Sequence, residues 1–345
     1  MAGFKTFGTS IVYPPSIDPG VRAVGVPHVW RASSAPDPTR RFWCDDEGLR
    51  SWHSRPQPTG HADPFGLQPA RQLVVRARHL ETVDHVVSLI HCGCLAAYPD
   101  LFQNRESSFV YDLEDAAGDE VPPSSIADGF QCFDQASIGV EAAARAWGNS
   151  GAEYALLKYR FSLERDWFTP HSAAPRHRDI FAYKYDDPRS QVNAAFAIVA
   201  AYSVIEELGL EVRSSQKKPR FLKDSGNAWN PEVLDDINAR LEAAGIPADS
   251  TVGWLWRGSR TDVEREIDPK LGKQAEWNRR FGTRDRMLAL ADAIHYVSWL
   301  RNYIAAHKLR AIATEVSPYE VHNAQMVARR VLLGFLGLWN RLVSG

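Results

Sequence analysis

The sequence lacks the features that mark several large classes of protein. Its four cysteines, Cys44, Cys92, Cys94 and Cys132, form no C-x-x-C pair, which favours a reducing compartment over a disulfide-rich secreted protein or a zinc ribbon. The longest apolar run, 194–205, is shorter than the roughly 20 residues of a membrane span. The first residues contain no apolar stretch of the kind that forms a signal peptide. We therefore expect a cytoplasmic protein without a membrane segment.

Charge of one sign and the common nucleotide motifs are also missing. The 40 Lys and Arg residues nearly balance the 42 Asp and Glu residues, giving a formal net charge of -2. Because there is no global positive field, a nucleic-acid partner would have to use a local patch. The sequence contains no P-loop, G-x-G-x-x-G, G-x-S-x-G or H-E-x-x-H motif, which argues against ATPases, dinucleotide-binding enzymes, α/β-hydrolases and zincins.

Composition indicates a globular protein, and the length allows two or three domains. The chain has 345 residues, of which 44% are hydrophobic and 24% are charged. The first 70 or so residues are rich in Pro, Ser, Gly and Trp, whereas the last 160 carry long helical patterns. We predict an α+β N-terminal domain over 1–150 and an all-α domain over 151–345, with a proline-containing linker over 170–188 and a boundary within 150–185.

Local patterns predict the individual elements of both domains. The segment 72–78 has the composition of a strand, and 81–97 and 139–147 have that of helices. The segment 153–167 fits both an alternating strand and a helix, and we favour the helix. Further helices are expected over 192–210, which is apolar nearly all round, over 230–244 behind the cap Asn230-Pro231, over 283–308 behind Thr283, and over 317–342 behind the capping box Ser317-Pro-Tyr-Glu320.

Two polar residues interrupt the apolar stripe of the 283–308 helix. Leu290, Ile294 and Val297 continue into Arg301 and then His307, at positions where the helical pattern requires apolar side chains. Burying an arginine and a histidine is unfavourable by several kcal/mol unless both find partners. Such exceptions usually mark a functional site.

The segment from Arg301-Asn302 to His307 resembles the R-[NHD]-x4-H motif of the HEPN superfamily (higher eukaryotes and prokaryotes nucleotide-binding). The resemblance covers residues 187–342, with a long insert over 211–283. Three other Arg/His pairs have similar spacing but do not lie on the apolar stripe of a long helix: Arg55 with His61, Arg78 with His85, and Arg165 with His171. The resemblance implies a helical bundle that acts as a metal-independent endoribonuclease without a cofactor. It also implies a homodimer with the site at its interface, and a role as a toxin or an antiviral, anti-phage defence effector.

The resemblance also implies roles for individual residues. The ribose 2′-OH would attack its own 3′-phosphate to give a 2′,3′-cyclic phosphate, with His307 transferring a proton and Arg301 bracing the phosphate oxygens. Asn302 would orient the histidine or the phosphate. Supporting residues are expected to be Glu206 or Glu207, which could hold Arg301. The candidate RNA contacts are Lys308, Lys217 and Lys218, the last two in a basic run with Arg213, Arg220 and Lys223.

Other interpretations remain open at the level of sequence. The helical domain could be a non-catalytic module that binds a nucleotide or a protein, with Arg301 paired to an acid. Metal-dependent hydrolysis would need a histidine in register with the acidic clusters at 45–47 or 112–115, and none is present. The His91-Cys92-Gly93-Cys94 sequence could hold a metal or could be buried as ordinary core. Trp254, Trp256 and Trp277 could stack on bases or belong to the core. For residues 1–150 we expect a domain that senses a trigger or selects the target.

Overall fold

The computed structural model describes residues 5–13, 22–24, 30–34, 41–45, 48–53, 68–97, 110–112, 131–133, 135–165, 187–222, 228–256, 284–305, 316 and 318–343. The chain forms two compact units, Met1–Glu153 and Tyr154–Gly345, and each buries an apolar core. Helices are combined with small, mostly antiparallel sheets, which confirms the mixed α and β class predicted from the sequence.

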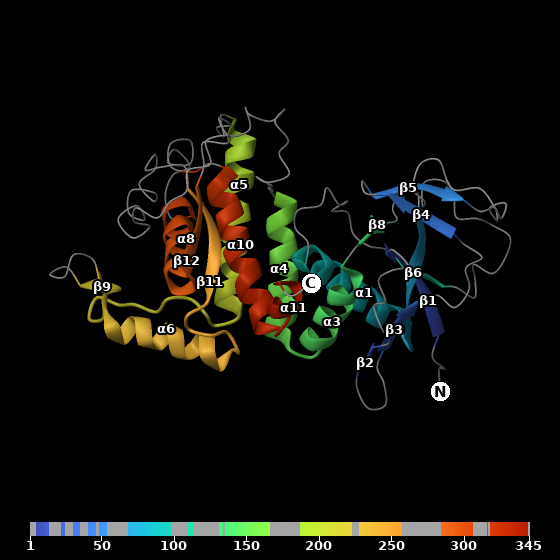
Figure 1. Cartoon of the computed structure of the whole chain (residues 1–345), viewed down its shortest axis with the longest axis horizontal. Coiled ribbons are helices and arrows are strands. Elements are labelled where there is room, and N and C mark those ends of the chain that lie inside the picture. The colour runs from blue at the N-terminus through green and yellow to red at the C-terminus, as the bar shows by residue number, and fades with distance from the viewer. Residues whose placement is uncertain are drawn as a thin grey trace. The chain divides into compact units, whose positions relative to one another are not determined.

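The first unit contains an 8-stranded sheet (Figure 1) with the path β2-β3-β6-β1-β7. Off this path, β4 pairs with β5 and β6, and β8 runs parallel to β1. The longest strand is β6, which contains most of the predicted 72–78 strand and buries Leu73, Val74 and Val75. The strands are β1 (Lys5–Tyr13), β2 (Arg22–Val24), β3 (Trp30–Ser34), β4 (Arg41–Asp45), β5 (Gly48–His53), β6 (Gln68–Ala77), β7 (Val110–Asp112) and β8 (Gln131–Cys132).

Two helices of this unit, α1 (Leu80–Ala97) and α3 (Ala136–Ala146), pack tightly against each other. They correspond to the helices predicted over 81–97 and 139–147. Their contact depends on glycine: a Cβ atom added at Gly93 would lie 2.7 Å from the Cβ of Ala142 and 2.9 Å from the Cα of Gly139. Among the described residues, α1 alone has the length and apolar composition that could cross a membrane, and 67% of it is buried inside the protein. That burial is typical of a core helix.

The second unit is built around three long helices that contact one another: α5 (Pro188–Glu207), α8 (Leu290–Ala305) and α10 (Pro318–Phe335) (Figure 1). The helix α4 (Ser150–Arg165) settles the ambiguous 153–167 segment in favour of a helix. The predicted helix behind Asn230 is confirmed as α6 (Pro231–Ala243), and the Asn230 side chain accepts a hydrogen bond from the Glu232 amide at 3.2 Å. The expected 192–210 helix begins earlier, because the Asp187 side chain caps it by accepting from the Ser190 amide at 2.9 Å.

The second unit also contains strands, so the prediction of an all-α domain was wrong. A short ladder joins β9 (Phe221–Leu222) to β10 (Ala228–Trp229), and a longer one joins β11 (Thr251–Trp256) to β12 (Arg284–Ala289). The helix predicted to start at Thr283 therefore starts at Leu290. Its first predicted turns pair instead with Thr251–Trp256, which the local capping signal could not reveal.

The side chain of Asn323 on α10 covers the free edge of β11. It accepts a hydrogen bond from the Leu255 amide and donates one to the Leu255 carbonyl, both at 2.8 Å. Helix α10 itself ends earlier than the predicted 317–342 stripe, because the chain turns at Gly337, whose φ is +64°, before the short helix α11 (Trp339–Val343).

Candidate functional site

Helix α8 carries the arginine and asparagine of the predicted motif and is fixed firmly at its start. It follows β12 without an intervening loop, and the Leu290 amide donates a hydrogen bond to the Ser250 carbonyl at 2.8 Å. The stripe residues Leu290, Ile294 and Val297 are fully buried. These contacts fix the rotation of α8 about its axis, and hence the direction in which Arg301 and its neighbours project.

Arg301 lies at the surface of the unit and contacts three side chains. One of its Nη atoms is 3.5 Å from Oε1 of Glu206 on α5, and the other donates to Oδ1 of Asn302 at 2.9 Å. Its guanidinium carbon is 5.7 Å from the ring centroid of Tyr202. The Arg301 side chain is 39% exposed, so the expectation of a core-facing position was wrong. A long arginine side chain can lie along an apolar surface and still bring its charged end to water.

The two consecutive glutamates of α5 pair with different helices. Glu206 is the partner of Arg301, whereas Glu207 forms an ion pair with Lys158 of α4. Because Arg301 and Glu206 are both 39% exposed, their ion pair contributes about 0–1 kcal/mol to stability. Its main effect is therefore to orient the guanidinium.

A polar network behind Arg301 was not anticipated from the sequence. Arg220 donates to Nδ1 of His295 at 2.8 Å and to Oγ of Ser298 at 3.1 Å. Because arginine can only donate, Nδ1 of His295 must be the acceptor and the imidazole must carry its proton on Nε2. His295 and Ser298 are buried on α8. Together with Asn302 they recur at helical spacing, a signal that would have revealed this polar face.

Tyr202 joins this network to Arg301. Burial raises the pKa of its hydroxyl, although a hydrogen bond with Ser298 and the charge of Arg220 act in the opposite direction. The tyrosine is therefore a neutral phenol at pH 7. It packs between the buried polar network and the exposed guanidinium of Arg301.

Aromatic rings enclose His295. The ring of Phe221 lies 4.7 Å from that of His295 in an edge-on arrangement, and the Trp229 ring lies 5.7 Å away. The indole nitrogen of Trp229 also donates to Oδ1 of Asp292 at 2.7 Å, which ties β10 to the start of α8. This enclosure keeps water from the histidine and makes it a structural anchor of α8.

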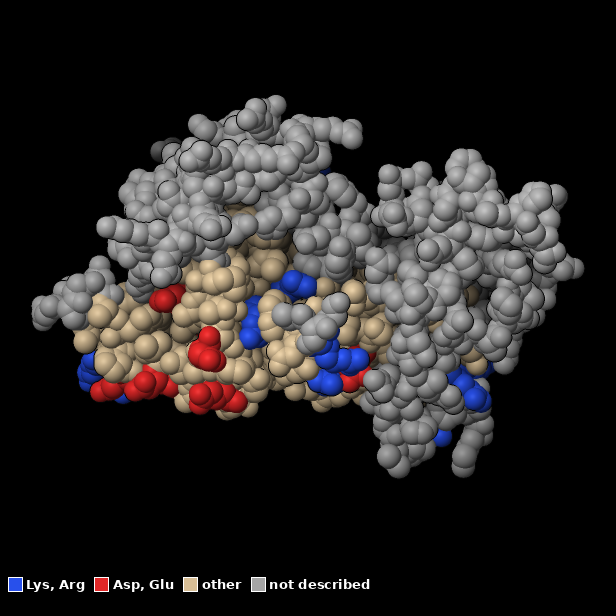
Figure 2. Space-filling view, viewed as in Figure 1, with Lys and Arg blue, Asp and Glu red and all other residues tan. Residues whose placement is uncertain are grey.

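The basic run is less positive than its sequence suggests. Lys217 and Lys218 are exposed, but Lys218 pairs with Glu232 of α6 at 2.8 Å, and a hydrogen bond between them raises the pKa of Lys218 and lowers that of Glu232. Figure 2 shows acidic side chains over α6, whose exposed acids include Asp235 and Asp236. Arg220 points into the protein, as described above.

The remaining predicted residues have simple outcomes. His307, Lys308, Lys223 and Trp277 lie outside the described residues. Trp254 is 2% exposed and belongs to the core. Within the described part of the chain, no group of three or more His, Cys, Asp and Glu side chains could hold a metal ion.

The cysteines of the His91-Cys92-Gly93-Cys94 sequence are buried core residues. Both thiols lie inside α1, and burial raises the pKa of Cys94 far above its ordinary value. The His91 ring packs edge-on against Phe133 at 5.3 Å.

The chain was compared with models of known protein families, with curated proteins and with solved structures, and it matches none of them.

Proposed function

We propose that this protein is a metal-independent endoribonuclease of the HEPN type, acting as a toxin or defence effector. The observation that carries the proposal is the placement of Arg301, whose guanidinium is partly exposed and is oriented by Glu206 and Asn302. A planar, permanently charged group held at a surface suits the two non-bridging oxygens of an RNA phosphate.

In the proposed reaction the RNA supplies its own nucleophile. The ribose 2′-oxygen attacks the adjacent phosphorus and loses its proton, the bond from phosphorus to the 5′-oxygen breaks, and a proton passes to that leaving oxygen. His307 is the group assigned to proton transfer, since an imidazole can both accept and donate near neutral pH. Arg301 stabilises the charge that develops on the phosphate, and Asn302 positions Arg301 through their hydrogen bond.

The helical arrangement supports this proposal without depending on any single contact. The motif helix α8 packs against the apolar helix α5 and against α10, in the order expected from the family resemblance. Strands β9 to β12 fall within or directly behind the predicted insert, and β11 and β12 pack against the three-helix core. We further propose that two copies of the chain form the complete site, because one helix presents its phosphate-binding groups from one side only.

The test combines growth, RNA integrity and purified enzyme. Wild type, Arg301→Ala and His307→Ala are expressed in a bacterial host, with Arg189→Ala as the matched control, since Arg189 is an exposed arginine of the same unit that lies outside the basic run and the candidate site. We expect RNA cleavage by wild type and by the control. We expect a loss of about 100- to 1000-fold in each site variant, the range found when one transition-state donor is removed.

Several readouts separate the alternatives. Cleavage should persist in EDTA and should leave 2′,3′-cyclic phosphate ends, and light scattering should show a dimer. Unchanged cleavage in both site variants would contradict the catalytic assignment. If wild type cuts no cellular RNA but binds a nucleotide or a protein, the chain is a non-catalytic module of the same fold.

A further inference from the structure

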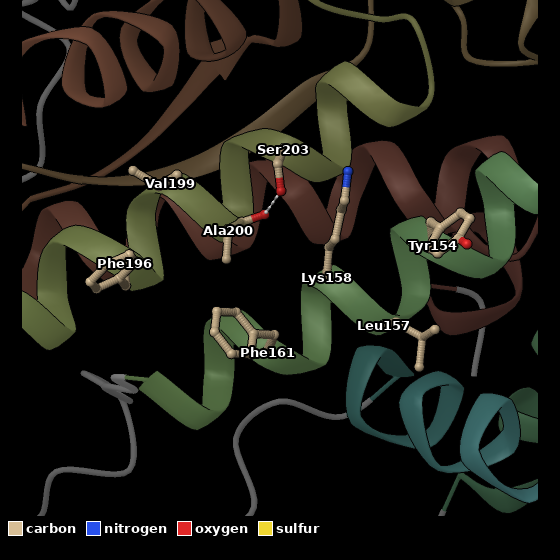
Figure 3. Close-up of a pocket in the computed structure, with 8 residues that line it drawn as sticks. All are labelled: Tyr154, Leu157, Lys158, Phe161, Phe196, Val199, Ala200 and Ser203. Atoms are coloured by element: carbon tan, nitrogen blue, oxygen red, sulfur yellow. Dashed lines mark hydrogen bonds between the residues drawn. The ribbon is translucent and has the colours of Figure 1, made fainter. Parts of the chain in front are cut away.

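An open groove lies between α4 and α5, and neither Arg301 nor Glu206 is among the residues that line it. Its volume is about 420 Å³ and its lining is almost entirely apolar. Figure 3 shows the side chains that line it, with the Phe161 ring of α4 directed toward α5. The lining residues are Tyr154, Leu157, Lys158 and Phe161 from α4, and Phe196, Val199, Ala200 and Ser203 from α5.

Three exposed aromatic side chains lie together in the groove. Tyr154 is 57% exposed, Phe161 is 42% exposed and Phe196 is 54% exposed. Of the large hydrophobic side chains that the structure describes as exposed, these three are the aromatic ones, and all three line this groove. Single exposed apolar residues are ordinary, but such clustering on a concave surface marks a binding site.

Cations accompany the aromatic rings. The guanidinium of Arg165 lies over the Phe161 ring, 4.5 Å from its centroid, and no carboxylate of the described residues pairs with it. Lys158 lines the groove one helical turn before Phe161 and pairs with Glu207. Aromatic rings beside basic side chains are the combination that binds single-stranded nucleic acid, because the rings stack on bases while the cations attract phosphates.

The groove also leads toward the candidate site. Ser203 lines its end, Glu206 follows one helical turn later on α5, and Glu206 pairs with Arg301. From Phe196 to Glu206 the helix advances about 15 Å, at 1.5 Å per residue. The neighbouring Glu207 contacts Lys158, so consecutive residues of α5 connect the Arg301 cluster with the groove.

We propose that this groove binds unpaired bases of the RNA substrate next to the cleaved bond, stacking them on Phe161, Phe196 and Tyr154. Arg165 and Lys158 then contact the phosphates of the same segment. This inference rests on the proposed function, since it takes RNA as the ligand. It adds a requirement that the RNA be single-stranded there, because paired bases do not expose their faces.

Binding is tested separately from cleavage, using the full chain. The probe is a fluorescent 12-nucleotide single strand with 2′-O-methyl groups throughout, which has no 2′-OH to attack, and binding is followed by fluorescence anisotropy at low salt. We expect Phe161→Ala and Phe196→Ala each to weaken binding about 5- to 100-fold, as is usual when a stacking ring is removed. The matched control is Met287→Ala, which removes a side chain that is 66% exposed and does not line the groove.

Two further variants decide whether stacking is the cause. Phe196→Trp should retain binding because it keeps an aromatic face, whereas Phe196→Leu keeps an apolar side chain and should lose binding. A double-stranded version of the probe should bind more weakly than the single strand. Circular dichroism checks that each variant is folded. We expect folded variants, because the substituted side chains are exposed.

Defined results would overturn the inference. They are absence of binding by wild type, unchanged binding in both alanine variants, or wild-type binding by Phe196→Leu. If Phe196→Ala abolishes self-association and leaves probe binding intact, the groove holds a second copy of the chain instead of RNA. These results are distinct from failure of the proposed function. If Phe161→Ala and Phe196→Ala bind the probe more weakly, the groove binds RNA even if Arg301→Ala still cleaves RNA normally.

Discussion

Replacing Asn323 with leucine should strongly destabilise the second unit. Asn323 is 1% exposed, and its amide satisfies both the amide and the carbonyl of Leu255 at 2.8 Å. Leucine has a similar size but no polar group, so the variant leaves two buried backbone groups without partners. Each such group costs about 1–3 kcal/mol, and the added apolar surface offsets part of that loss. We expect a decrease of about 3 kcal/mol in the free energy of unfolding.

The assay is urea denaturation followed by circular dichroism, with tryptophan fluorescence as a second probe of unfolding. The matched control is Asn193→Leu in α5, because Asn193 is half-buried and its side chain makes no hydrogen bond to the described residues. That change should alter stability by less than about 1 kcal/mol. A loss below about 1 kcal/mol in Asn323→Leu would refute the reasoning that this side chain completes the edge of β11.

Asn323→Asp provides a second check with a definite pH dependence. A carboxylate can accept from the Leu255 amide but repels the Leu255 carbonyl, whereas the protonated acid can donate to it. The deficit relative to wild type should therefore shrink as the pH falls toward about 4, near the ordinary pKa of aspartate. A deficit that grows on acidification would contradict this explanation.

The remaining predictions concern the contact between α1 and α3. Gly93→Ala should lower the free energy of unfolding by about 1–2 kcal/mol despite the better helix propensity of alanine, because the added Cβ would lie 2.7 Å from the Cβ of Ala142. Urea unfolding measures the change. The control is Gly253→Ala, where an added Cβ has no atom within 4 Å. Burial raises the pKa of Cys94, so iodoacetamide at pH 8 should label it only after unfolding, as mass spectrometry would show. Above the thiol's ordinary pKa of 9.0 only the unfolded chain releases this proton, so stability should fall as pH rises, and Cys94→Ala should reduce that alkaline slope. An identical slope in both proteins would count against the buried thiol as its source.

Local sequence signals predicted the elements whose boundaries are set locally. Asn230 caps α6 as expected, and the 153–167 segment is a helix because its apolar positions, including the buried Leu156 and Tyr159, face one side. Non-local pairing was invisible to the same signals. The segment from Arg284 was assigned to a helix because Thr283 resembles a cap, while its true partner is the distant β11.

The candidate site shows the same division. The sequence singled out Arg301 and offered Glu206 as one of two partners, but it placed Arg301 in the core, because periodicity records where a Cβ points and not how far a long side chain extends. His295 and Arg220 were missed as a pair because they are separated by a long stretch of chain and meet only when Phe221 of β9 and Trp229 of β10 pack against His295 of α8. The groove could not be predicted, because the sequence does not show which aromatic side chains stay exposed after α4 packs on α5.

The direct join between β12 and α8 has a consequence for how this protein can vary. Inserting or deleting one residue between Ala289 and Leu290 would rotate everything after it by about 100° around the helix, and Arg301 would no longer face Glu206. A homologue that performs the same task should therefore keep a constant spacing from Arg284 to Asn302.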